Sequence, residues 1–359
     1  MTKKLWFQVG IGILLTLLII KYVIEVKFIF NPIFIILKTI FLPLLLSGVL
    51  FYITVPIQSF LEKRKVPRWG SISIIFLLLI AGIWAAVAIV GPQITRQVNN
   101  LIENAPMFVQ EANVFFIQLL QQTGSLPGWL KDSIDSVTES LNTITVQFGK
   151  WIVQFVQSII QGTLILVLVP FFLIFMLKDH EKFLPFIQQF LSGETKKWVT
   201  KTLKDIDEVL SLYIRGQILI STILATLLFI GYSIIGLNFA LLLSVFALFM
   251  NVIPFIGPWI AFIPALIIGV IQDPMMIIWV SLTTLIAQQI DSNLITPNVM
   301  GKTLKIHPLT IITILFAAGS LAGFLGILLA VPGYAVGKAI VSNIYEKRRT
   351  IKETANKTV

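Results

Sequence analysis

The chain has no cysteine and little charge. Among its 359 residues, 12% are charged and 57% are hydrophobic, and there are two histidines, His180 and His307. The absence of cysteine excludes disulfides, thiolate metal sites and cysteine nucleophiles. The sequence also has no His-Glu-x-x-His zinc helix and no Gly-x-Ser-x-Gly elbow. We therefore predict a protein that is not an enzyme and has no catalytic residue, no metal site and no cofactor.

A phosphate-binding loop is also missing. Gly301-Lys302-Thr303 resembles the end of such a loop, but Thr296 stands where its first glycine belongs, and no buried strand precedes it. The net charge of +10 could suggest nucleic acid as a partner. The basic residues, however, flank apolar runs, as they do on the cytoplasmic side of membrane proteins. We predict no nucleic-acid partner, and no ATP-driven transport by this chain alone.

Long apolar runs dominate the chain, and the mean hydropathy is +0.92. Several runs are near or above the roughly 20 residues that cross a bilayer as a helix. Lys3 and Lys4 precede the first run as in a secretory signal, but no small-residue cleavage site follows, so we interpret that run as a retained span. The runs expected to cross the membrane are Leu5 to Ile20, Phe28 to Ile57, Ser71 to Val90, Trp151 to Leu177, Ile218 to Ile235 and Met275 to Ile290.

Two further apolar stretches, 239–271 and 309–340, are too long for one crossing and are interrupted by glycine and proline. The first break is Asn251-Val252-Ile253-Pro254-Phe255-Ile256-Gly257-Pro258, and the second lies within 317–326. Irregular backbone is tolerated at membrane depth only where protein or water covers it. Secondary transporters use such broken helices to build substrate sites. We therefore predict two broken, re-entrant helical hairpins.

The lysines and arginines indicate the orientation. If six runs cross and both hairpins re-enter, most of the 27 basic residues lie in the cytoplasm together with both chain ends. Lys38 falls within a span, and the basic residues left outside are Lys21, Lys27, Arg96, Lys131 and Lys150. The two hairpins are then oppositely oriented. Full crossings in place of hairpins remain an alternative, which the excess length disfavours.

The remaining segments complete the organisation. Residues 92–150 carry two heptad patterns around a Gly-Pro turn and predict an extracytoplasmic amphipathic helical hairpin, with an oligomer contact or a membrane-surface lid as alternatives. Residues 178–217 predict an amphipathic helix at the inner membrane surface, with a site for a regulatory partner as the alternative. The expected order is helices in 1–91, the external hairpin 92–150, a span in 151–177, the cytoplasmic segment 178–217, the transport core 218–340 and a basic cytoplasmic tail 341–359.

Ionisable residues in apolar spans are costly and so mark candidate functional sites. Lys38 either snorkels or pairs across helices. Asp291 lies one helical turn from Gln288, so both can face one polar cleft, although Asp291 can equally be a solvated helix end. Gln217, Asn251 and Ser320 add uncharged hydrogen-bonding groups.

These motifs resemble a known family. The 251–258 break, Asp291-Ser292-Asn293-Leu294-Ile295-Thr296-Pro297-Asn298, His307-Pro308-Leu309 and the glycine-rich run from Gly319 are similar to the AI-2E (autoinducer-2 exporter) family of bacterial membrane proteins, also described as UPF0118-like. The resemblance implies a secondary transporter in the cell membrane, working by an elevator-like motion as a homo-oligomer, specifically a pentamer. Some members export autoinducer-2, a quorum-sensing signal, and others are assigned sodium/proton exchange.

We therefore expect an all-α polytopic membrane protein that exports a small polar metabolite such as autoinducer-2. Sodium (cation)/proton antiport is the alternative, and a non-transporting membrane scaffold is a further one. The partners would be a small solute or ion and the lipid bilayer. The expected coupling residues are Asp291 and Lys38. The expected substrate-site residues are Asn251, Pro254, Gly257, Pro258, Gln288, Asp291, Asn293, Gly319, Ser320 and Gly323.

Overall fold

The computed structural model describes residues 5–26, 28, 31–101, 103, 147, 163–301 and 306–357. Within these residues the secondary structure is helical, joined by turns, and contains no strand. The expected external hairpin lies almost wholly outside the described residues, as does the first part of the span predicted in 151–177. Two compact units are present, one formed by Met1–Phe51 with Thr163–Leu177 and the other by Tyr52–Gly162 with Lys178–Val359.

The smaller unit contains α1 (Leu5–Glu25) and the first parts of α2 (Asn31–Lys63) and α6 (Thr163–Gln188). The side chains of α1 are almost all exposed, although the helix is apolar along its length. In α2, Ser47 is buried and its hydroxyl hydrogen-bonds to the carbonyl oxygens of Pro43 (2.7 Å) and Val169 (2.9 Å). This contact ties α2 to α6 within the unit.

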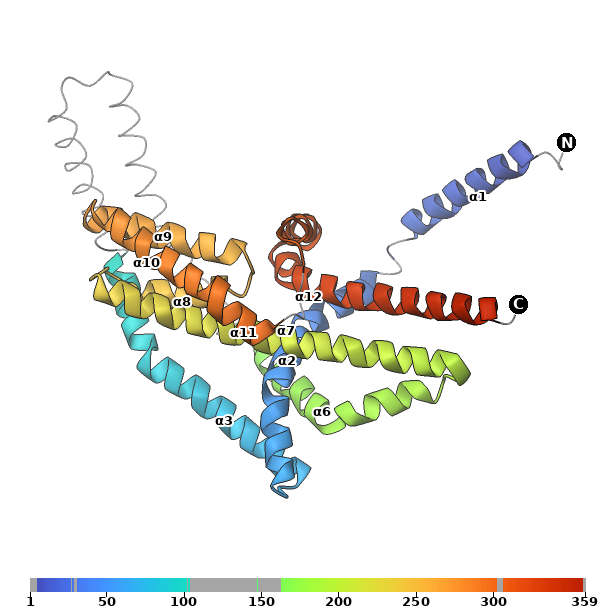
Figure 1. Cartoon of the computed structure of the whole chain (residues 1–359), viewed down its shortest axis with the longest axis horizontal. Coiled ribbons are helices and arrows are strands. Elements are labelled where there is room, and N and C mark those ends of the chain that lie inside the picture. The colour runs from blue at the N-terminus through green and yellow to red at the C-terminus, as the bar shows by residue number, and fades with distance from the viewer. Residues whose placement is uncertain are drawn as a thin grey trace, which may run out of the picture. The chain divides into compact units, whose positions relative to one another are not determined.

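The larger unit is organised around α7 (Gly193–Ile234), a helix of 42 residues. Its apolar half packs against α8 (Ala240–Met250) and α10 (Met276–Ile290), and its more polar first half contacts α12 (Pro308–Lys357). Helix α9 (Ile256–Gln272) packs against α8 and α10. Figure 1 shows α7, α8, α9 and α10 side by side. After α10 the chain continues helically through a π-helical segment, Asp291–Ile295, and the short α11 (Thr296–Met300).

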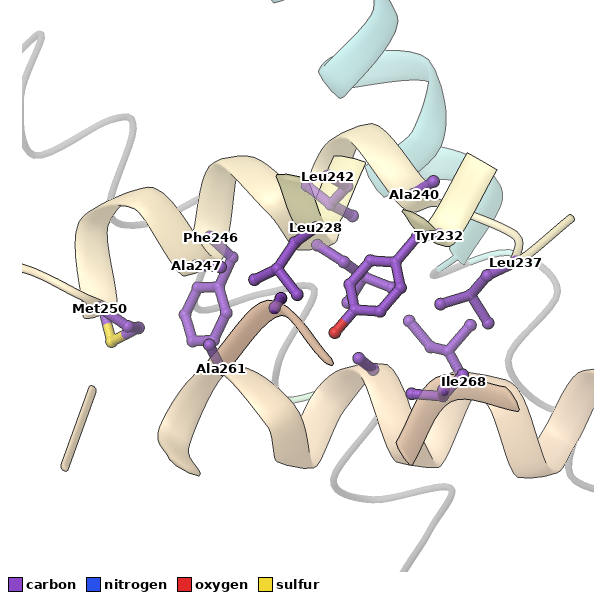
Figure 2. Close-up of a cluster of buried hydrophobic side chains, with 14 of the residues drawn as sticks. Leu228, Tyr232, Leu237, Ala240, Leu242, Phe246, Ala247, Met250, Ala261 and Ile268 are labelled. Atoms are coloured by element: carbon purple, nitrogen blue, oxygen red, sulfur yellow. The ribbon is translucent and has the colours of Figure 1, made fainter. Parts of the chain in front are cut away.

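The core between these helices is apolar and closely packed. Figure 2 shows Leu228 and Tyr232 of α7 between the side chains of α8 and those of Ala261 and Ile268 on α9. The Tyr232 hydroxyl is buried and hydrogen-bonded to Thr284 Oγ1 of α10 at 3.0 Å. Val98 and Leu101, from the helical residues that follow α3 (Arg68–Ile89), pack into the same cluster.

Helix length supports a membrane-embedded fold. Among the described residues, four helical stretches are long and apolar enough to cross a bilayer: Asn31–Lys63, Arg68–Leu101, Gly193–Ile234 and Pro308–Arg349. Large apolar side chains are exposed on them, among them Leu77 (67%), Trp84 (72%) and Phe316 (71%). Such surfaces are costly in water and suit hydrocarbon. The predicted all-α polytopic membrane class is confirmed.

The segment 178–217 differs from the expected separate surface helix. The structure continues α6 to Gln188, turns at residues 189–192, and begins α7 at Gly193. The same helix then runs without a break into the apolar stretch that begins at Ile218. Hydropathy alone does not show that the backbone remains helical where the charges end. The tail from residue 341 is likewise part of α12, which remains helical to Lys357.

An ion pair fixes the start of α3 on the polar end of α6. The Arg68 guanidinium donates to the Glu181 carboxylate at 2.5 Å and lies 3.1 Å from His180 Nδ1. The hydrogen bond from Arg68 holds the pKa of the Glu181 carboxyl below its usual range. His180 is therefore part of a polar helix-end contact.

Candidate transport site at the tip of the first hairpin

The first predicted break is a helical hairpin. Helix α8 ends at Met250, and α9 begins at Ile256 and runs back along it. Figure 2 places Ala261 opposite Ala247 near the tip, with Ile268 toward the Leu237 and Ala240 end, which is an antiparallel arrangement. The 11 residues of α8 span about 16 Å, roughly half the hydrocarbon thickness. An arm of this length matches the predicted re-entrant hairpin, which would reach about halfway into a bilayer.

The tip, residues 251–255, follows from local backbone chemistry. Pro254 and Pro258 have no amide hydrogen, and Phe255 adopts φ +65°, a left-handed conformation that is rare for an aromatic residue. Gly257 closes the turn: a Cβ there would lie 2.0 Å from the Met250 carbonyl oxygen. Only glycine allows this approach, so α8 and α9 can converge tightly.

Buried polar groups lie at this tip without partners. The Asn251 side chain is 3% exposed, and neither its Nδ2 nor its Oδ1 has a hydrogen-bond partner among the described residues. Ser221 Oγ on α7 is in the same condition, at 1% exposure. Each unsatisfied buried group costs about 1 to 3 kcal/mol, and such groups call for an explanation. A polar ligand would supply the missing bonds.

Helix α7 presents a polar stripe toward the tip. Gln217 is buried, and its Nε2 donates to the backbone carbonyl of Asn251 at 2.6 Å. Tyr213, Gln217 and Ser221 recur every four residues and so share one helical face. Sequence reasoning singled out Asn251 and Gln217 but missed Ser221 and Tyr213. The four-residue recurrence across the start of an apolar run was the signal that could have found them.

The second predicted break is also a fold-back, inside α12. Ala322 and Gly323 leave the helical conformation, Gly323 with φ +60°. Cβ atoms at Gly326 and Gly319 would lie 2.0 Å from the Ala318 carbonyl oxygen and 3.0 Å from Ile327 Cγ1. Residues eight apart in a straight helix are about 12 Å apart along its axis. The chain must therefore fold back here. Figure 1 shows only that α12 is not one straight helix, since one part is seen end-on and the rest from the side.

Both hairpins share one core next to α7. Ile253 of the first tip and Tyr213 of α7 are buried in a single cluster with Ile311, Leu315, Ala330 and Val331 of the second hairpin. Ser320, by contrast, is exposed and its hydroxyl donates to the Ala317 carbonyl at 2.8 Å. Gly319 and Gly323 shape the fold-back. The polar groups closest to the shared core are thus those of the first tip and α7.

Asp291 and its neighbours form a different local structure. Asp291 begins the π-helical segment, and its carboxylate accepts a hydrogen bond from Thr296 Oγ1 at 2.8 Å. Gln288 is half-buried on α10, and Asn293 is exposed and donates to Gln289 Oε1. The π-helical segment packs against α7, α10 and α11. π-Helical turns are frequent at functional sites, so this carboxylate stays a candidate coupling group.

Lys38 belongs to the smaller unit, where its side chain is exposed on α2 and makes no ion pair with a described residue. Within the described residues, His, Asp and Glu side chains nowhere gather in threes that could hold a metal ion. The polar side chains described at the first tip and on the adjoining face of α7 are uncharged, so they can bind a solute only through hydrogen bonds.

Long apolar helices, two fold-back hairpins and a buried polar tip define a polytopic α-helical membrane protein with broken helices. The model of the AI-2E family transporter matches residues 11–346. The chain belongs to this transporter family.

Three relatives whose names describe transport proteins or permeases are similar to this chain over most of its length. The chain is 37% identical over 349 residues to "Putative transport protein YueF" of Bacillus subtilis, covering 92% of this chain and 91% of the relative. It is 30% identical to "Putative transport protein YrrI" of the same organism, covering 96% and 97%. It is 28% identical to "Putative permease PerM" of Escherichia coli, covering 83% and 86%.

Proposed function

We propose that the chain is a gradient-driven secondary transporter that exports a small polar solute, with autoinducer-2 as the first solute to test. The observation that carries the proposal is a pair of buried, unpartnered polar groups, Asn251 at the hairpin tip and Ser221 on α7, one helical turn beyond the Gln217 that contacts the tip. A small, oxygen-rich solute would hydrogen-bond to both without needing a charged partner. The proposal assigns no catalytic step and no cofactor.

Fold and site together favour alternating access. A hairpin tip at membrane depth, next to a second hairpin, is an arrangement that secondary transporters use to expose one site to each side in turn. Gly257 and Gly326 let each hairpin close tightly enough to move as a unit. Packing of Ile253 with Ile311 and Leu315 in one cluster links the two hairpins during such a movement.

Proteoliposomes test this function directly. Purified protein is reconstituted, and release of internal autoinducer-2 is measured in parallel with sodium-dependent change of an internal pH indicator. We expect saturable release of autoinducer-2 above that of protein-free liposomes. Sodium-dependent proton movement without release of autoinducer-2 would instead establish the antiporter.

Antiport remains the second candidate because a carboxylate is present in the π-helical segment. If Asp291 couples transport to a proton or cation gradient, Asp291→Asn should abolish gradient-driven accumulation while exchange down the solute's own gradient survives. The amide keeps the shape and still accepts from Thr296 but cannot ionise. Asp273→Asn is the matched control, since Asp273 is exposed and accepts from the Met275 amide at the start of α10. Unchanged accumulation in Asp291→Asn refutes the coupling role.

We also propose a bacterial cell-membrane location with both ends in the cytoplasm. Because the chain lacks cysteine, single cysteines at Ser125, Ser192 and Thr303 can be labelled without background. A membrane-impermeant thiol reagent added to intact cells should label only the Ser125 position. Labelling at Thr303 would contradict the two-hairpin topology, because the loop before α12 lies outside only if the first broken stretch, 239–271, is a full crossing.

A further inference from the structure

A basic groove lies on the polar half of α7. It is a shallow groove, open to solvent, with a volume of about 500 Å³, and it is lined by Gln188, Lys196, Lys197, Thr200, Lys201, Lys204 and Asp205. The α7 residues recur at spacings of three and four, which places them on one helical face. Four lysines thus stand against a single carboxylate in the groove.

That carboxylate is already engaged. Asp205 Oδ2 accepts a hydrogen bond from Asn343 Nδ2 of α12 at 2.7 Å. Lys197 pairs with Glu194 and Lys201 with Glu346, both outside the groove lining. Lys196 and Lys204 are exposed and have no ion-pair partner among the described residues. Two ammonium groups are therefore available to an anion.

The positions of these lysines also destabilise the N-terminal part of α7. Lys196 and Lys197 lie near the N-terminus of α7, whose dipole disfavours cations there, and Ser192 makes no side-chain capping bond. Lys197 and Lys201 are four residues apart, which adds like-charge repulsion. A bound anion would offset both the unfavourable interaction with the helix dipole and the repulsion between the lysines. The Thr200 hydroxyl accepts a bond from Gln188 at 3.0 Å, and its own hydrogen can be donated to a ligand oxygen.

We propose that this groove binds a phosphate-bearing anion. Phosphate suits the site because several ammonium groups and a hydroxyl can each contact one of its oxygens. The contacts of Lys201 with Glu346 and of Asp205 with Asn343 join the groove to α12, which carries the second hairpin. Binding there would therefore act on a helix of the transport core.

Distance along α7 favours a soluble phosphate compound over a lipid headgroup. Arg215 is the last charged residue before the apolar half of α7, and Lys204 and Lys196 precede it by about 16 and 28 Å along the helix axis. An average tilt of about 20° shortens this little. The headgroup region adds only roughly 5 to 8 Å on each side of the hydrocarbon. The groove then lies in the aqueous phase.

Thermal unfolding of the detergent-solubilised full chain tests the proposal with two probes. One is inorganic pyrophosphate, and the other is short-chain phosphatidylglycerol compared with short-chain phosphatidylcholine. We expect pyrophosphate to raise the melting temperature and the double variant Lys196→Gln with Lys204→Gln to need about tenfold more pyrophosphate for the same shift. The double variant Lys63→Gln with Lys65→Gln removes the same charge elsewhere and should respond like the wild type.

The outcomes separate the two sources. A shift with phosphatidylglycerol alone, lost in the Lys196 and Lys204 variant, assigns the same groove to a lipid headgroup. The proposal is overturned if neither probe raises the melting temperature. It is also overturned if both probes raise it equally in the wild type and in the Lys196 and Lys204 variant. The test measures binding and not flux, so its failure leaves the proposed export function untouched.

Discussion

Alanine at Gly326 is expected to destabilise the protein by about 3 kcal/mol and to abolish transport. The added Cβ would lie 2.0 Å from the Ala318 carbonyl oxygen, a backbone atom that cannot rotate away. Helix propensity alone predicts the opposite sign, because alanine is favoured over glycine by about 1 kcal/mol within a helix. The clash is the larger effect because it forces the fold-back at Ala322 and Gly323 to open.

Gly333→Ala in the same helix is the matched control. A Cβ at Gly333 would meet no atom within 4 Å, so this variant should be neutral or slightly more stable and should transport normally. Thermal unfolding and proteoliposome flux are measured for both variants at equal protein density. Equal stability of the two variants would mean that the second hairpin is not closed as described.

Leucine at Asn251 is expected to move stability and activity in opposite directions. Leucine has a similar branched shape but no polar atoms, so the unpartnered buried amide is removed, and the free energy of unfolding should rise by about 1 to 2 kcal/mol. The hydrogen bond from Gln217 ends on the backbone carbonyl of residue 251 and survives the substitution. Transport should fall at least tenfold, since a hydrogen-bonding group of the proposed site is lost.

Ser244→Ala provides the comparison for Asn251→Leu. Ser244 is buried on α8, but its hydroxyl donates locally to the Leu241 carbonyl at 3.0 Å. Its removal should leave transport close to that of the wild type. An Asn251→Leu variant that transports normally would show that the unpartnered amide is incidental to function.

The positions of both hairpins could be predicted from the sequence because they depend on local backbone chemistry. Pro254, Pro258 and Gly257 interrupt the helix wherever the chain is placed, and the structure puts α8 and α9 within one residue of the stretch 239–271. The sequence predicts the second break within 317–326, and the structure places it at Ala322 and Gly323.

Features that depend on tertiary packing could not be predicted in the same way. In the sequence nothing distinguishes Ser221 from other serines, and only its burial on α7 without a hydrogen-bond partner marks it. The expectation that Gln288 and Asp291 face one polar cleft depends on a regular α-helical turn between them. The chain instead enters a π-helix at Asp291, where the carboxylate meets Thr296 five residues later. An unbroken α7 likewise reflects packing along its whole length, with its first half against α12 and its apolar half against α8 and α10.

Thiol labelling at Ser221 is the measurement that most directly tests whether the polar tip receives the transported solute. Ser221→Cys is nearly isosteric, and the chain has no other cysteine. In reconstituted, transporting protein, a small water-soluble thiol reagent should label Cys at this position, and the solute identified by the flux assay should slow the labelling. A thiol that reacts only after unfolding, or that labels equally fast with and without solute, would contradict a transport site at this tip.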